Sequence, residues 1–195
     1  MEKNSEKMQE KWNKRYGNGT AIPAPLKVLT ANEHLLPTTG EALDLACGLG
    51  ANALYLAARG FKTVAWDISS VALARLQDEA KARKVTVTVR EADLSISKIP
   101  PDSFDVITVG HFLERGMVAE ICRGLRVGGL LYYQTFTRDR ISERGPDNPA
   151  FRLGENELLE LFAQLQILVY REEGLNGDIT QGCREEAYLV GQRRV

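Results

Sequence analysis

The sequence lacks the features that mark several large classes of protein. No apolar run approaches the roughly 20 residues that a membrane-spanning helix needs, and the charged N-terminus has no apolar signal region. Lys and Arg total 25 against 26 Asp and Glu, so the chain shows no basic excess of the kind that nucleic-acid-binding domains carry. The three cysteines lie far apart and form no C-x-x-C pair, which indicates neither a disulfide framework nor a zinc site. We therefore expect a cytoplasmic protein with no membrane, nucleic-acid or metal partner.

The chain of 195 residues is 44% hydrophobic, which is enough for one sizeable core. We expect a single domain over residues 21–195, preceded by an N-terminal helical segment over residues 1–20. Within that segment Met8, Trp12 and Tyr16 recur every four residues and line one helical stripe. The stripe predicts either a helix fixed on the core or a lid over a cleft, with the glycines around Asn18 as its hinge.

From residue 42 onward, apolar strand-like segments alternate with helical ones. This alternation indicates βαβ units, and therefore a three-layer α/β domain with a mostly parallel sheet of seven strands. No helical pattern lies between Glu172 and Ala187, so we expect the last strand to be antiparallel and to lie at the end of the sheet. The expected strands are 42–46, 61–66, 85–90, 104–109, 130–136, 166–172 and 187–191, and the expected helices are 2–17, 51–59, 70–84, 117–125 and 155–163.

Three consecutive strand ends carry residues suited to binding a nucleotide-like ligand. Gly48 and Gly50 lie in the turn after the first strand, where glycine permits a tight turn and a close approach to the backbone. Asp67 follows the second strand, where a carboxylate can accept hydrogen bonds from both ribose hydroxyls. Asp93 follows the third. The glycine spacing also satisfies the dinucleotide-binding pattern, so the turn alone leaves the ligand open.

The motifs at these strand ends resemble those of class I S-adenosylmethionine-dependent methyltransferases over nearly the whole chain. More narrowly, the chain is similar to the tellurite-resistance methyltransferase group, although it has Ala51 where that group often has Arg. The segments that carry the general resemblance are Asp44-Leu-Ala-Cys-Gly-Leu-Gly, Trp66-Asp-Ile-Ser, Ala92-Asp-Leu and Phe104-Asp-Val-Ile. Those of the narrower one are Asn52-Ala-Leu-Tyr-Leu-Ala, His111-Phe-Leu and Phe151-Arg-Leu-Gly-Glu-Asn-Glu-Leu.

The resemblance implies a set of roles for individual residues. S-adenosylmethionine would be the cofactor, with its ribose on Asp67 and its adenine near Ile68, Asp93 and the Leu94 amide. The methionine part would lie near Asp44, Gly48, Gly50 and Asn52, and the sulfonium near Gly110. Arg15 and Tyr16 are further candidates for contact with the cofactor. His111 is the candidate catalytic residue, and Phe112 and Arg152 are candidates for substrate contact.

The expected reaction is direct attack by a small-molecule acceptor on the methyl carbon of the cofactor. A soft nucleophile such as a thiol or a metalloid oxyanion is favoured, because the sulfonium is already a strong electrophile and alignment is then most of the task. An oxygen or nitrogen nucleophile with a proton to lose would need a base, for which His111 is placed best. The alternatives are a non-catalytic S-adenosylmethionine-binding regulator and a dinucleotide-dependent oxidoreductase. An antiparallel strand at the end of the sheet speaks against the second of these.

Overall fold

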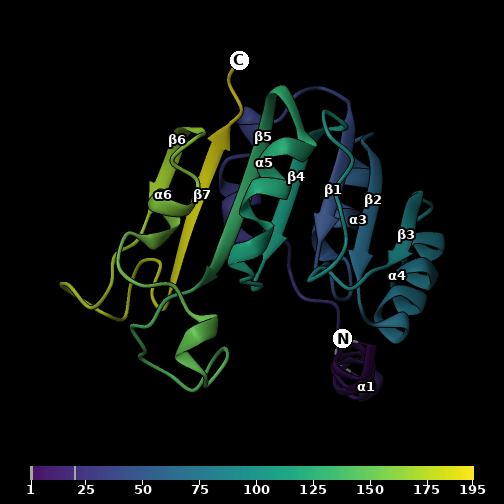
Figure 1. Ribbon diagram of the computed structural model, residues 1–195, viewed down its shortest axis with the longest axis horizontal. Helices are drawn as coiled ribbons and strands as arrows, with labels where there is room; N and C mark the ends of the chain where they lie inside the picture. Colours follow the sequence, from purple (N-terminus) through teal and green to yellow (C-terminus); the bar gives the residue numbers. More distant parts are fainter. Residues whose placement is uncertain (1, 20) are drawn as a thin grey trace.

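The computed structural model describes residues 2–19 and 21–195, and its centre is one seven-stranded sheet (Figure 1). The strand order is β3-β2-β1-β4-β5-β7-β6. The strands are β1 Glu41–Leu45, β2 Lys62–Asp67, β3 Val87–Glu91, β4 Phe104–Gly110, β5 Leu125–Phe136, β6 Gln166–Arg171 and β7 Glu186–Gln192.

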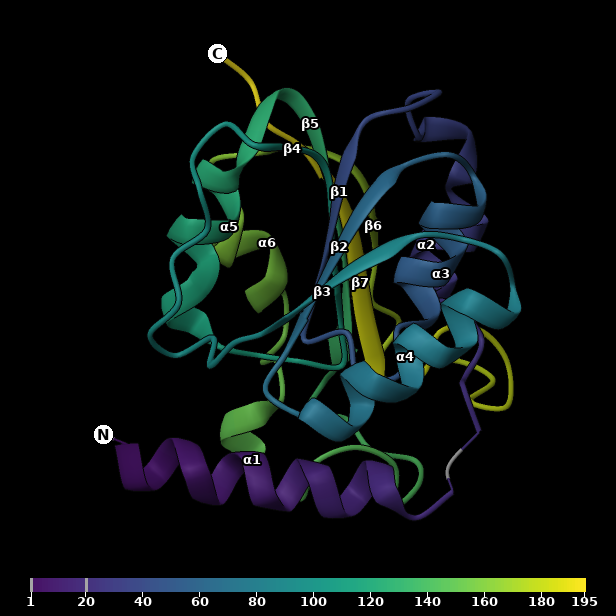
Figure 2. The same cartoon turned by 90° about the vertical axis from the view of Figure 1, so that its right-hand side faces the viewer.

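Helices cover both faces of the sheet, as Figure 2 shows edge-on. Helices α2, α3 and α4 lie on one face, α5 and α6 lie on the other, and α1 crosses the lower edge. No helix within the described residues is long and apolar enough to span a membrane. The helices are α1 Glu2–Gly17, α2 Lys27–Ala31, α3 Ala51–Ala58, α4 Ser70–Ala82, α5 Val118–Gly124 and α6 Glu157–Leu161, with short 3₁₀ turns η1 Glu33–Leu35, η2 Arg115–Met117 and η3 Pro149–Phe151.

The predicted three-layer fold with a C-terminal antiparallel strand is confirmed. Strands β1 to β5 pair in parallel, and β7 is antiparallel to both β5 and β6. The position of β7 differs from the prediction, because β7 lies between β5 and β6 and the edge strand is β6. The crossover through α6 places β6 parallel to β5 but one strand position away from it. The helix-free segment before β7 then reverses the chain, so that β7 fills the position between β5 and β6.

Strand β5 begins five residues earlier than the sequence predicts. The two glycines at 128 and 129 lie between the expected helix 117–125 and the expected strand 130–136, but in the structure they are inside the strand, beside a register irregularity of the β4–β5 pair. Gly128 has a φ of 84°, which a residue with a side chain seldom adopts. Glycine therefore marks a bulge here, not a helix end.

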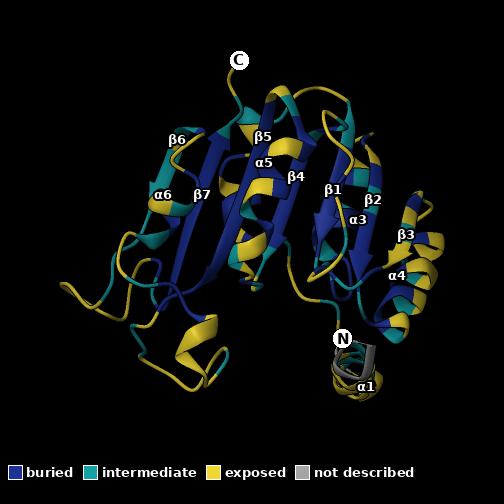
Figure 3. Cartoon of the chain, viewed as in Figure 1, coloured by how far each residue is buried: buried dark blue, intermediate teal, exposed yellow. Residues whose placement is uncertain are grey.

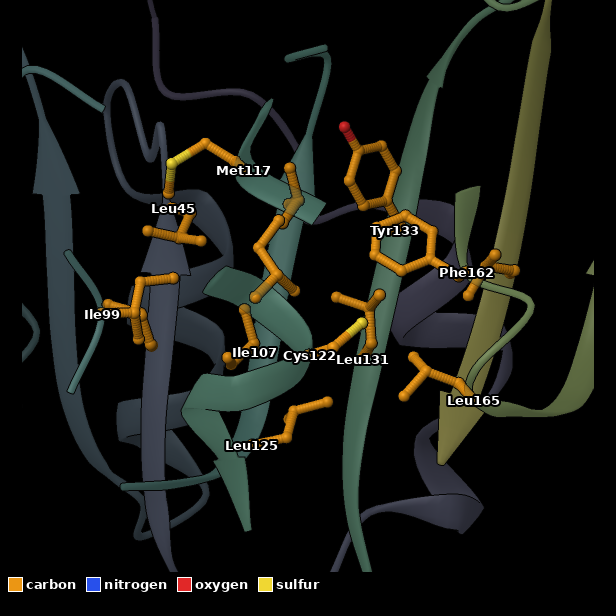
Figure 4. Close-up of a cluster of buried hydrophobic side chains, with 14 of the residues drawn as sticks. Leu45, Ile99, Ile107, Met117, Cys122, Leu125, Leu131, Tyr133, Phe162 and Leu165 are labelled. Carbon is orange, nitrogen blue, oxygen red and sulfur yellow. The ribbon is translucent and has the colours of Figure 1, made fainter. Parts of the chain in front are cut away.

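The apolar core lies on both faces of the four central strands, which are the most buried part of the molecule (Figure 3). Leu45, Ile107 and Leu131, from three neighbouring strands, meet Cys122 of α5 and Phe162 just after α6 (Figure 4). The opposite face packs against α2 and α3. Because the centre of the sheet is rigidly packed, the side chains at the ends of its strands are held at fixed positions.

The sheet has a switch point between β1 and β4. The chain leaves β1 toward α3 on one face and leaves β4 toward α5 on the other (Figure 2). Connections that diverge in this way form a crevice at the carboxyl ends of the two strands. Ligands of open α/β sheets bind in such a crevice. In Figure 1 the carboxyl ends of these strands lie at the lower edge of the sheet, where α1 also lies.

Candidate active site

The turn from β1 into α3 contains two glycines with different surroundings. Gly48 and Gly50 have φ angles of 52° and 73°, in the left-handed region that favours glycine. A Cβ on Gly48 would lie 2.6 Å from the Tyr16 hydroxyl, above the turn. A Cβ on Gly50 would lie 2.3 Å from Leu76, a buried residue of α4. Gly50 therefore makes room for the core and not, as expected, for a ligand, whereas Gly48 leaves a space at the turn that the Tyr16 hydroxyl covers.

This difference predicts that two matched substitutions affect different properties, one the stability of the domain and the other ligand binding. Gly50→Ala should lower the free energy of unfolding by about 2–3 kcal/mol, because it adds backbone strain and a collision inside a packed core. Gly48→Ala carries the strain alone, since the Tyr16 side chain can move, and it should affect ligand binding more than stability. Denaturant unfolding of both variants checks this. A Gly50→Ala domain as stable as the wild type would contradict the assignment.

Asp67 ends β2 directly beside the glycine turn. It is 5% exposed, and its carboxylate accepts hydrogen bonds from the amides of Gly48 at 2.7 Å and Ser69 at 2.8 Å. Burial raises the pKa of Asp67, and these amide hydrogen bonds oppose the rise. Each carboxylate oxygen keeps a lone pair for a ligand hydroxyl. The contact therefore joins the turn and the acid into one unit.

Asp44 is fully buried beneath the turn and bonds only to protein groups that the structure describes. It accepts hydrogen bonds from Thr108 at 2.8 Å, the Ala53 amide at 3.1 Å and the Asn52 side chain at 3.3 Å. Asn52 in turn accepts from the Leu26 amide at 2.9 Å. Asp44 and Asn52 were both expected near the methionine part of a cofactor. In the structure they attach the turn to β4 and to the segment before α2.

The predicted adenine region lies after β2 and β3. Asp93 is half-buried and accepts from the amide and hydroxyl of Ser95, which closes a local turn. The Leu94 side chain is buried, while its amide donates to no group in the part of the chain that the structure describes. Ile68 is half-buried next to Asp67. An unused amide and a carboxylate beside an apolar side chain are groups that an adenine ring can use.

Helix α1 lies across the carboxyl ends of β1, β2 and β3 (Figure 2). Its Asn13 accepts hydrogen bonds from the Ser69 hydroxyl at 2.7 Å and the Val71 amide at 3.3 Å, which caps the N-terminus of α4 from outside. Gln9 donates to Glu91 at the end of β3. The expected apolar stripe is therefore wrong in part: Met8 is 40% exposed, and the side that faces the sheet is mostly polar.

The last turn of α1 brings one of its two candidate residues to the crevice. The Tyr16 hydroxyl lies over Gly48, and burial together with the nearby charge of Asp67 raises the pKa of Tyr16. Arg15 is exposed and lies over the ring of Trp12, at 5.4 Å from its centroid. The structure therefore places Tyr16, but not Arg15, at the glycine turn. Met1 and Thr20 fall outside the described residues.

On the other side of the switch point, β4 ends in Gly110 and His111. A Cβ on Gly110 would lie 2.9 Å from Leu26, so this glycine makes room for the segment before α2. His111 has a φ of 52°, its amide donates to Gln134, and its side chain is 41% exposed. Phe112 packs against the core beside α5. The left-handed turn at His111 therefore leaves its ring at the crevice while the next residue turns inward.

Two residues absent from the predicted site complete the surroundings of His111. Glu186, at the start of β7, is 7% exposed and lies 3.1 Å from the Nε2 of His111. Gln134 donates to the other oxygen of Glu186, and the His111 ring stacks on Phe136 at 4.8 Å between centroids. Hydrogen bonds from His111 and Gln134 and the charge of Arg144 outweigh burial and lower the pKa of Glu186. The carboxylate is therefore ionised near neutral pH.

Arg152, a candidate for substrate contact, is a structural residue instead. It is 1% exposed, and its guanidinium donates to the backbone carbonyls of Thr137, Arg144 and Pro146. These bonds close the loop over residues 138–152, whose two ends meet at a bridge between Thr137 and Leu153. The bonds to the loop carbonyls occupy the Arg152 guanidinium within the protein.

A hollow of about 370 Å³ opens beside β5 and β7, at the same edge of the sheet. Gln134 and Glu186 form part of its wall, so the hollow adjoins the groups around His111. In the order of the strands, the glycine turn comes first, His111 follows on β4, and the hollow lies beyond it on β5 and β7. Its lining also includes Lys27, Ile141, Arg144, Ile179, Thr180, Gln181, Gly182, Cys183, Arg184 and Glu185.

Comparison with known proteins shows which family the middle of the chain resembles. Residues 42–129, from β1 into β5, match the family described as a methyltransferase domain. The resemblance to methyltransferases is confirmed. The probable S-adenosyl-L-methionine-dependent methyltransferase TehB of Haemophilus influenzae is 29% identical over 174 residues, which cover 85% of this chain and 58% of that protein. This chain thus spans less than two thirds of the length of that relative.

Solved structures give the same result for the fold. The crystal structure of TehB from Haemophilus influenzae has a TM-score of 0.69 at 22% identity and covers 95% of this chain and 67% of that one. A structure that concerns conversion of a disulfide bond into a thioacetal group during echinomycin biosynthesis has a TM-score of 0.71 at 20% identity, and covers 96% of this chain and 92% of that one. The chain therefore has the fold of the methyltransferases, and residues 42–129 within it are similar to a methyltransferase domain.

Proposed function

We propose that this protein transfers a methyl group from S-adenosylmethionine to a small-molecule acceptor, with a thiol or a metalloid oxyanion as the favoured class. The observation that carries the proposal is the joined unit of Gly48 and Asp67 at the switch point of a methyltransferase fold. The resemblance to the tellurite-resistance group favours a soft nucleophile.

The residues at the crevice fit the cofactor. Gly48 leaves a space under the Tyr16 hydroxyl that any side chain would fill, Asp67 has acceptors for ribose hydroxyls, and the Leu94 amide is free to donate within the described structure. The cofactor supplies an electrophilic methyl group when bound. The tasks of the protein are then to hold the acceptor in line with that group and to exclude water. The rigid ends of β1 and β4 help to hold the acceptor in line, and α1, which lies over the glycine turn, helps to exclude water.

Calorimetry with S-adenosylhomocysteine and with NAD tests the ligand class. We expect binding of S-adenosylhomocysteine and none of NAD. Asp67→Ala should weaken S-adenosylhomocysteine binding by about 1.5–3 kcal/mol, roughly 10- to 150-fold, because hydrogen bonds to an ionised group are lost. Glu41→Gln is the matched control, since it removes a carboxylate at the amino end of β1, on the opposite edge of the sheet. An unchanged affinity in Asp67→Ala would show that Asp67 does not hold the ribose.

A methyl-transfer assay against thiols and metalloid oxyanions tests the reaction itself. Turnover with either class supports the proposed function. Tight binding of S-adenosylhomocysteine without turnover on any acceptor of these classes would favour a non-catalytic binder instead.

A further inference from the structure

We infer that His111 is a general base, oriented by Glu186, and that the acceptor is therefore a thiol that loses its proton during methyl transfer. This inference rests on the proposed function and narrows it. It separates the two favoured acceptor classes, because a thiol has a proton to lose, whereas a metalloid oxyanion that attacks through a lone pair needs no base.

The geometry around the imidazole fixes which nitrogen acts. The Nε2 of His111 lies 3.1 Å from Glu186 Oε1, and an ionised carboxylate can only accept a hydrogen bond. The proton of neutral His111 is therefore held on Nε2, and the lone pair is on Nδ1. Within the described residues Nδ1 has no hydrogen-bond partner, and the side chain is 41% exposed. Nδ1 is thus free to accept a proton from a bound molecule.

Glu186 is itself held in place from two sides. Gln134 donates to Oε2 of Glu186, while its own carbonyl accepts from the Val28 amide at 2.9 Å. Arg144 donates to Oε1 at 3.1 Å. The carboxylate is 7% exposed, so its charge is little screened by water and stabilises the imidazolium that forms. Glu186 is a positioning residue, because it acts through His111.

The position of His111 along the sheet edge suits this role. It follows β4, between the glycine turn after β1 and the hollow of about 370 Å³ beside β5 and β7. Glu186, which contacts the imidazole, forms part of the wall of that hollow. Phe136, stacked on the ring, keeps its plane fixed.

The proton and electron balance is simple. The S–H proton passes to Nδ1 of His111 while a sulfur lone pair forms the new bond to the methyl carbon. The carbon–sulfonium bond breaks, and its electron pair stays on the departing sulfur as a neutral thioether. His111 leaves the reaction as an imidazolium paired with Glu186 and releases its proton to solvent. No further oxidant, reductant or metal is required.

Two nucleophiles that differ in their protons test the inference. The probes are 2-mercaptoethanol, which must lose a proton, and iodide, which has none. In His111→Gln at pH 7, kcat/KM should fall about 100-fold or more with 2-mercaptoethanol and stay within about twofold with iodide. The loss with the thiol should shrink as pH approaches the pKa of the thiol, because the thiolate then forms without a base. Glu186→Gln should show the same selectivity with a smaller loss.

His34→Gln is the matched control, since it changes the only other histidine of the chain and lies away from the crevice, on η1. It should leave both rates unchanged. The same variant allows a readout without turnover, because His111 is then the sole histidine. Diethylpyrocarbonate should modify His111, and S-adenosylhomocysteine together with 2-mercaptoethanol should slow the modification.

The outcomes separate this inference from the proposed function. Equal losses with the thiol and with iodide would show that His111 only shapes the site, and a histidine that diethylpyrocarbonate does not reach would also overturn the base assignment. Turnover of neither probe by the wild-type protein would overturn the proposed transfer to a small soft nucleophile, and the base assignment with it.

Discussion

Deletion of residues 2–17, the whole of α1, is expected to leave the sheet domain folded and to lower methyl transfer by about 100-fold or more. No described residue of α1 belongs to the clusters of buried apolar side chains that form the core. Its contacts with the body include polar ones from Gln9, Asn13 and the Tyr16 carbonyl, which accepts from Arg75 at 2.7 Å. Polar contacts exchange with water at little net cost, so their loss should not unfold the sheet.

The loss of activity follows from the position of the helix. Tyr16 covers Gly48, and its removal opens the glycine turn to solvent. Water would then compete with the ligand at Asp67 and reach the methyl group. Thermal melts, single-turnover rates and hydrogen exchange of the truncated protein measure these effects. Exchange in α1 should be fast without ligand and slowed by S-adenosylhomocysteine.

A pair of point variants keeps this prediction testable within the full chain. Asn13→Ala removes the contact that caps α4, whereas Lys14→Ala changes a neighbouring exposed residue of the same helix. Only the first should speed exchange in α1 and weaken ligand binding. If the truncated protein unfolds, or if exchange in α1 is already slow without ligand, the helix is a fixed part of the fold and not a lid.

Residues whose roles depend on the order of strands could be predicted from the sequence. The alternation of strands and helices predicts that the Gly48 turn and Asp67 each lie at the carboxyl end of a strand. Because the strands are parallel and adjacent, these two carboxyl ends lie at the same edge of the sheet. The hydrogen bond between Gly48 and Asp67 is the local result. Glu186 could have been found in the same way. An antiparallel last strand begins at the edge where parallel strands end, so an acid at its start lies at the same edge as the carboxyl ends of β4 and β5.

Residues whose roles depend on a particular packing neighbour could not be predicted in this way. Nothing local to Gly50 reveals that Leu76 of α4 fills the space beside it. The residues around Arg152 are typical of an exposed basic side chain. Only the closed loop over residues 138–152 shows that its guanidinium donates to backbone carbonyls. The docking side of α1 is a similar case. Periodicity marks its apolar stripe, but Asn13 faces the body because it caps α4, a contact between segments more than 50 residues apart.

The buried Asp44 makes the stability of this domain depend on pH in an unusual direction. Burial raises its pKa from 3.8 to about 6, although Thr108, Asn52 and the Ala53 amide all donate hydrogen bonds that favour the ionised form. Desolvation of the charge therefore outweighs three hydrogen bonds. Between pH 4 and 6 the folded protein binds a proton at Asp44 that the unfolded chain releases. Lower pH in this window thus stabilises the folded state through Asp44, whereas carboxylates with a lowered pKa, such as Glu186, act in the opposite direction.

Comparison with Asp44→Asn isolates this effect, because the amide does not titrate. The interval between 3.8 and about 6 corresponds to about 3 kcal/mol. As the pH falls from 8 to 4, the free energy of unfolding of the wild type should rise by about that amount relative to Asp44→Asn, with half of the change complete near pH 5. Urea unfolding at a series of pH values measures the difference, and Asp102→Asn, on an exposed turn before β4, serves as the control. A difference between wild type and Asp44→Asn that stays constant across this range would show that Asp44 is ionised as readily in the folded protein as in the unfolded chain, and that the hydrogen bonds beneath the turn compensate fully for its burial.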